Sequence, residues 1–178
     1  MPAPANVTVA KQLKEKTEKA TFIRNFIFGV EDSLVSTVGL VSGVAVAGVD
    51  KTTILLTGLV LIVVEALSMG VGSLLSESST QELVFRKRSS LRLPVVGGLI
   101  MFVSYFVAGF IPLAPYALLD VAHAFPLSIA MSVLTLFLLG YVSARVLKGK
   151  PLRSGLRMLV LGGLAIGAGA LIGHWLRV

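Results

Sequence analysis

The stretch from Gly29 to Ser76 reads GVEDSLVSTVGLVSGVAVAGVDKTTILLTGLVLIVVEALSMGVGSLLS. It contains two apolar runs that are each long enough to cross a bilayer, joined by a short polar step around Asp50. Carboxylates lie inside both runs: Glu31 and Asp32 in the first, and Glu65 in the second. Because an ionised carboxylate costs at least about 2.5 kcal/mol at the centre of a membrane helix, its presence there indicates a function or a partner.

The composition of the whole chain predicts an integral membrane protein. Of its 178 residues, 55% are hydrophobic and only 14% are charged, and cysteine is absent, so any bound metal must use oxygen, nitrogen or thioether ligands. We expect a cytoplasmic N-terminal amphipathic arm over residues 1–24 and a transmembrane domain over residues 25–178. The apolar runs predict an all-α membrane protein with five transmembrane helices, at about Phe26–Gly48, Thr52–Ser76, Pro94–Leu119, Pro126–Val146 and Gly155–Leu176.

The lysines and arginines predict the orientation of the chain. Five spans place the two termini on opposite sides of the membrane, and 14 of the 16 basic residues then fall on one side. Five lie in the arm, four between the second and third spans and five between the fourth and fifth, which leaves Lys51 and Arg177 on the other side. This asymmetry predicts a cytoplasmic N-terminus and a C-terminus on the opposite side. It also accounts for the net charge of +7 without a nucleic-acid partner.

Asp32, Glu65 and Met69 form the predicted metal site. Asp32 lies 18 residues before Asp50 and Met69 lies 18 residues after Lys51, so a symmetric hairpin would put Asp32 and Met69 at one depth. Carboxylate oxygens and a thioether suit a divalent first-row metal such as iron(II) or manganese(II). Carboxylates also bind protons, so protons and metal would compete for this site.

Three further polar residues are expected to serve metal entrance or proton coupling: Glu31, Ser36 and Glu77. On a helix, Glu31 points about 100° away from Asp32, so the two carboxylates do not serve one ligand on the same face. The structural alternatives are that Glu65 is a buried hydrogen-bonding group, that Met69 fills a gap in the core, and that Ser36 bonds its own helix. Glycine pairs four residues apart, such as Gly39/Gly43 and Gly169/Gly173, suit close helix packing or a dimer seam.

Several motifs in the chain resemble the vacuolar iron transporter family, and the resemblance covers most of the sequence after Thr21. They are Gly29–Gly43, Ala66–Gly72, Gln81–Leu83, Gly109–Tyr116 and Pro151–Met158. The resemblance implies a five-helix homodimer that carries ferrous iron, and often manganese, out of the cytoplasm in exchange for protons. It matches the membrane-embedded aspartate of the family to Asp32 and the second-helix methionine to Met69. It does not extend to Glu65, which is a candidate ligand only because it lies on the same helix face as Met69.

Two features of the chain depart from this family. Members with a cytoplasmic metal-collecting domain insert a long glutamate-rich helical segment between the second and third spans. Here only 17 residues, Glu77–Leu93, fill that gap, so the chain resembles a short member that lacks the domain. The family's Gly-Glu-Tyr after the methionine is replaced by Gly72–Leu74, with Glu77 about one turn later.

We therefore expect a multi-pass membrane transporter of divalent transition metals, in a cell or organelle membrane that the sequence does not specify. Its partners would be metal ions, protons, the lipid bilayer and a second copy of the chain, with no permanently bound cofactor. The alternative is a non-transporting membrane metal sensor or scaffold. An enzyme is not expected: Ser42, the candidate nucleophile of a hydrolase, lies on a plain helical run without a base beside it.

Overall fold

The computed structural model describes residues 5–85 and 91–177, and in these ranges it contains five helices and no strand. Each helix is long and apolar enough to cross a membrane, which confirms the predicted all-α, five-span fold. The basic residues Arg86, Lys87 and Arg88 counted above lie outside the described residues. The helices are α1 (Ala5–Ala47), α2 (Lys51–Phe85), α3 (Arg92–Leu118), α4 (Val121–Val146) and α5 (Pro151–Trp175).

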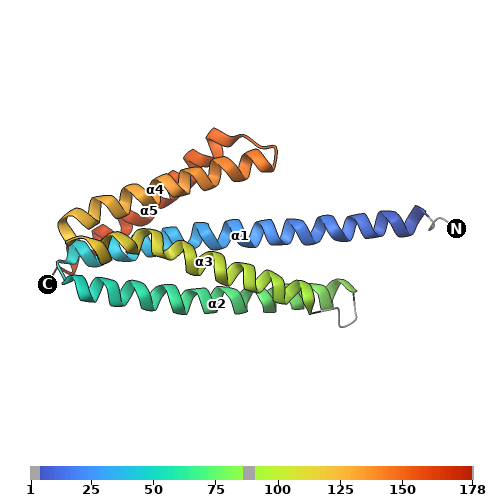
Figure 1. Ribbon diagram of the computed structural model, residues 1–178, viewed down its shortest axis with the longest axis horizontal. Helices are drawn as coiled ribbons and strands as arrows, with labels where there is room; N and C mark the ends of the chain where they lie inside the picture. Colours follow the sequence, from blue (N-terminus) through green and yellow to red (C-terminus); the bar gives the residue numbers. More distant parts are fainter. Residues whose placement is uncertain (1–4, 86–90, 178) are drawn as a thin grey trace.

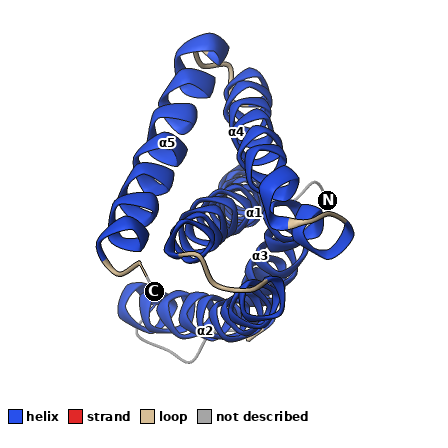
Figure 2. Cartoon of the chain, turned by 90° about the vertical axis from the view of Figure 1, so that its left-hand side faces the viewer, coloured by secondary structure: helices blue, strands red, loops and turns tan. Residues whose placement is uncertain are grey.

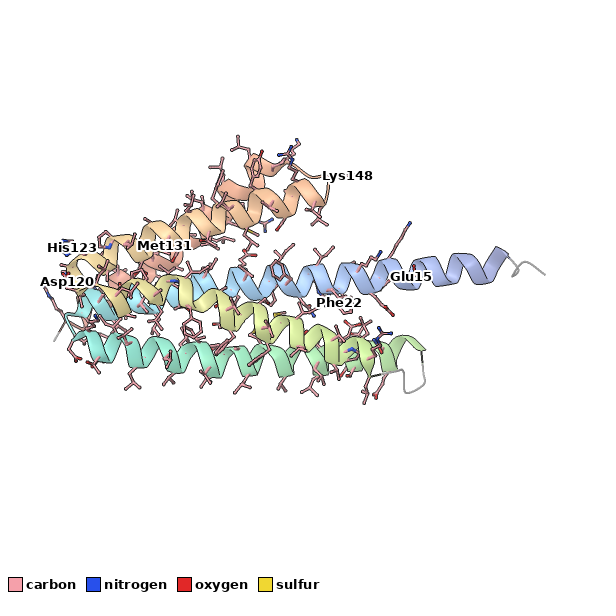
Figure 3. The ribbon with its side chains drawn as sticks, in the orientation of Figure 1. Glu15, Phe22, Asp120, His123, Met131 and Lys148 are labelled. Atoms are coloured by element: carbon pink, nitrogen blue, oxygen red, sulfur yellow. The ribbon has the colours of Figure 1, made fainter. Side chains whose placement is uncertain are left out.

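The chain termini and the connections between the helices lie at two opposite ends of the described bundle (Figure 1). The N-terminus lies at the same end as the last turns of α2 and α4, and the C-terminus lies at the other end with the connection between α1 and α2 (Figure 1). Lys148 points toward the first end, and Asp120 and His123 lie at the second (Figure 3). We call these the basic end and the distal end. The separation is the one that the census of basic residues requires, and the assignment of the basic end to the cytoplasm stays a prediction.

The N-terminal arm and the first span form one continuous helix. From Ala5 to Ala47, α1 runs without a break, and its N-terminal part extends beyond the other helices (Figure 1). Thr21 and Asn25 are already buried, whereas most side chains of residues 15–20 are exposed. The protruding part of the helix is therefore the segment before about Thr21.

Helix α3 lies between α1 and α2 over much of their length. In the end-on view α1 is central, with α2 and α3 on one side and α4 and α5 on the other (Figure 2). Both α1 and α2 pack extensively on α3, and they contact each other much less. Glycines on α3 permit this close approach: a Cβ on Gly98 would lie 2.7 Å from the Gly70 carbonyl oxygen, and one on Gly109 would lie 2.6 Å from Ile62 and 2.9 Å from Ser33.

Glycine pairs also bring α1 and α5 together, backbone against backbone. A Cβ on Gly43 would lie 2.7 Å from the carbonyl oxygen of Gly169, and side chains on Gly169 and Gly173 would overlap the backbone of Gly39 and Gly43. In the structure these two glycine pairs form a seam within one chain. The outward surfaces of α2 to α5 carry exposed leucine and valine side chains, and α1 exposes Ile23, Phe26 and Phe28, as expected for a protein that faces lipid.

Candidate metal site

The register between α1 and α2 decides which side chains share a depth. Helix α1 ends at Ala47 and α2 begins at Lys51, so the three connecting residues belong to neither helix. Counted from these ends, Asp32 and Ala66 each lie 15 residues into their helices, so Asp32 is level with Ala66 and its neighbour Glu65. The symmetric count predicted Met69 at the depth of Asp32, which is three residues away from Ala66, the residue that the helix ends place there.

A hydrogen bond fixes this register independently. The side-chain amide of Asn25 in α1 donates to the hydroxyl oxygen of Ser73 in α2 at 2.9 Å. Four residues from this bond toward the distal end, Gly29 of α1 is level with Met69 of α2. This level is about one turn closer to the basic end than Asp32. The bond and the helix ends give the same register.

Asp32 of α1 and Glu65 of α2 lie within electrostatic range of each other. Both side chains are half-buried. Such a pair in a membrane interior requires a cation or protons to balance its charge. Met69, also half-buried, lies on the same face of α2 as Glu65, one turn toward the basic end.

Tyr105 of α3 is the residue that sequence reasoning missed. Its side chain is fully buried, and its hydroxyl lies 2.7 Å from the Ser36 hydroxyl oxygen, the two forming a hydrogen bond. The same hydroxyl lies within electrostatic range of Asp32 and Glu65. One signal could have found it: a tyrosine inside a long apolar run needs a partner for its polar tip.

The predicted entrance residues Glu31 and Glu77 have different surroundings. Glu31, the neighbour of Asp32 on α1, interacts electrostatically with Arg157 of α5 as well as with Asp32. Glu77 is largely buried and pairs with Arg24 at 3.7 Å. Glu31 therefore lies at the depth of Asp32, whereas Glu77 lies about three turns closer to the basic end than Glu65.

The carboxylate pair does not by itself provide a full coordination sphere. Among residues 5–85 and 91–177, no group of three or more histidine, cysteine, aspartate or glutamate side chains is placed to hold a metal. A divalent ion at Asp32 and Glu65 would need neutral ligands, for which the thioether of Met69 and water molecules are candidates. This donor set fits a borderline divalent metal that keeps part of its water shell.

Known proteins similar to this chain carry names that refer to iron transport. "Vacuolar iron transporter 1" of Tulipa gesneriana is 25% identical over 228 residues, covering 94% of this chain and 92% of that protein. "Vacuolar iron transporter homolog 4" of Arabidopsis thaliana is 25% identical over 161 residues. "Vacuolar iron transporter cccA" of Arthroderma benhamiae is 38% identical over 82 residues, and the match spans 41% of this chain but only 29% of that protein.

The alignments also bear on the short connection between α2 and α3. The tulip alignment spans 228 positions, more than the 178 residues of this chain, so the relative carries residues that have no counterpart here. The sequence profile of the VIT family matches residues 23–93 and 82–174, two segments that overlap where α2 ends and α3 begins. Together these segments cover most of the chain and include part of every helix, and the chain belongs to the VIT family.

Proposed function

We propose that the protein moves iron(II) or manganese(II) out of the cytoplasm in exchange for protons, with Asp32, Glu65 and Met69 binding the metal. The observation that supports the proposal is that Asp32 and Glu65 lie within electrostatic range of each other, on two helices that are each long and apolar enough to cross a membrane. Membership of the VIT family and the names of the relatives support metal transport.

Charge balance gives a physical reason for exchange. Two neighbouring carboxylates carry two negative charges, which one divalent cation or two protons would neutralise. Because an unbalanced pair is costly in the bilayer, the site would favour release of metal when protons arrive, and release of protons when metal arrives. This alternation would couple the two fluxes without a second binding site.

The remaining predicted residues have roles consistent with this path. Glu77 would attract cations at the basic end, which the charge asymmetry assigns to the cytoplasm. Glu31 and Ser36, beside Asp32 on α1, would serve metal entrance or proton coupling. A homodimer would add ligands from a second copy, since one chain supplies only the carboxylate pair and neutral donors.

Transport of radioactive manganese or iron into proteoliposomes, with and without a pH gradient, tests this proposal. We expect Asp32→Asn and Glu65→Gln to abolish metal-dependent proton flux while the protein stays folded. Asp50→Asn is the matched control, because Asp50 is an exposed carboxylate in the connection between α1 and α2. Full flux in both site variants would refute the role of the pair. Metal binding without flux in the unmodified protein would favour the sensor alternative.

A further inference from the structure

We infer that Tyr105 is a positioning residue of the metal site, which uses its hydrogen bond to Ser36 to hold Asp32 where it shares a metal ion with Glu65. The inference rests on the proposed function and extends it to a third helix. It starts from the two hydrogen bonds that Tyr105 makes with the helix turn that carries Asp32.

Two hydrogen bonds join Tyr105 to the turn of α1 that begins at Asp32. The hydroxyl of Ser33 donates to the Tyr105 carbonyl oxygen at 2.6 Å, and the Tyr105 hydroxyl bonds Ser36 at 2.7 Å. Ser33 and Ser36 follow Asp32 by one and four residues. Ser33 bonds the backbone of α3, and Ser36 bonds the far end of the Tyr105 side chain. Together the two bonds fix the rotation of α1 against α3.

Tyr105 also stands on the side of α3 that faces α2. Gly109, four residues later and therefore on the same face, packs between Ile62 of α2 and Ser33 of α1. Glu65 is three residues from Ile62, on the corresponding face of α2. This packing agrees with the electrostatic interaction of Tyr105 with both Asp32 and Glu65.

The hydroxyl pair has a donor left over for the site. Ser36 and Tyr105 have two O–H donors, and their mutual bond uses one. The second reaches only the Ser33 carbonyl at a long 3.4 Å if Ser36 provides it. If Tyr105 provides it, the donor is available to Asp32 or Glu65, which both lie within electrostatic range, or to a metal-bound water. Outer groups of this kind commonly change metal affinity about 10–100-fold when they are removed.

Manganese binding by the purified full chain tests the inference, with free Mn²⁺ measured by electron paramagnetic resonance. We expect Tyr105→Phe and Ser36→Ala each to weaken binding on the order of tenfold, and the double variant to bind no more weakly than either single one, because both remove one bond. In liposomes the KM for Mn²⁺ should rise while the maximal rate per folded protein changes little. A merely structural role would lower thermal stability and leave KM unchanged.

Tyr116→Phe is the matched control. Tyr116 lies on the same helix, is equally buried, and packs in an apolar cluster with Val41 and Ile54, about three turns from Tyr105. It should leave Mn²⁺ affinity unchanged. If Tyr105→Phe fails to fold, Ser36→Ala reports the same bond from the other side. Wild-type affinity in these variants, with affinity lost in Asp32→Asn, would overturn the inference alone. Wild-type affinity in Asp32→Asn as well would overturn the proposed function.

Discussion

The side-chain amide of Asn25 in α1 lies 2.9 Å from the hydroxyl oxygen of Ser73 in α2, although the two residues are 48 positions apart in the chain. The same amide donates to the carbonyl oxygen of Gly97 in α3 at 3.0 Å. One buried side chain therefore joins three helices, on the basic-end side of the carboxylate pair. It sets the register in which Asp32 meets Glu65.

Replacement of Asn25 should destabilise the bundle more than replacement of its partner Ser73. Asn25→Ala removes both hydrogen bonds, at about 1 kcal/mol each, whereas Ser73→Ala removes one. We expect a loss of about 2 kcal/mol in the free energy of unfolding for Asn25→Ala and about 1 kcal/mol for Ser73→Ala. Unfolding by denaturing detergent, followed by circular dichroism, measures both. Equal losses in the two variants would show that the bond to Gly97 contributes nothing.

The sequence predicted the spans and their order because long apolar runs leave few alternatives in a membrane. It did not predict the register of Asp32, because the count assumed a symmetric turn and the structure places all three connecting residues outside both helices. It also missed Tyr105: a tyrosine inside an apolar run indicates that a polar partner is needed, but the partners lie in α1, about 70 positions earlier, and the local sequence does not identify them. The placement of α3 between α1 and α2 depends on Gly98 and Gly109, whose role only packing reveals.

The seam between α1 and α5 predicts opposite effects for glycines on one helix. In Gly169→Ala and Gly173→Ala the new methyl group would overlap the backbone of α1, which cannot move aside as a side chain can. Such overpacking typically costs about 1–3 kcal/mol. Gly163 and Gly167, on the same helix, have no atom of the described chain within 4 Å of an added Cβ. Alanine there should be neutral or stabilise the helix by up to about 1 kcal/mol.

Thermal unfolding in a mild detergent separates these four variants. The two seam variants should unfold at lower temperature than the unmodified protein, and the two outward variants at the same or a higher temperature. If all four alanine variants behaved alike, the close contact of α1 with α5 would not exist in the folded protein.

Asp50 should make the stability of the protein depend on pH in acid. Its carboxylate caps the start of α2, accepting hydrogen bonds from the Thr53 hydroxyl at 2.7 Å and the Thr53 backbone N–H at 3.1 Å. These bonds hold the pKa of Asp50 below its ordinary value. Because the pKa is lower in the folded state, the stabilisation is present above about pH 4, the ordinary pKa of an aspartate. It is lost as the pH falls through the folded-state pKa.

Asp50→Asn isolates this contribution, since asparagine is also a good helix cap but carries no charge. We expect the unmodified protein to be more stable than the variant near neutral pH, and the difference to shrink as the pH falls below about 4. Comparing the two unfolding curves at each pH cancels the other carboxylates. A difference that stayed constant across this range would mean that Asp50 titrates normally in the folded protein.

Substitution of Gly109 tests whether the distance between Asp32 and Glu65 depends on the absence of a side chain at this position of α3. In Gly109→Ala the new Cβ would lie 2.6 Å from Ile62 and 2.9 Å from Ser33, so α1 and α2 would have to separate from α3. We expect weaker Mn²⁺ binding as well as lower stability, because that separation moves the two carboxylates apart.

Ile62→Ala alone removes a fully buried side chain and should cost about 2–5 kcal/mol. In the double variant, however, the truncated Ile62 makes room for the new methyl group. Its loss of stability should therefore be smaller than the sum of the two single losses, with part of the Mn²⁺ affinity restored. Additive losses, with no recovery of binding, would show that Gly109 does not control the distance between the acids.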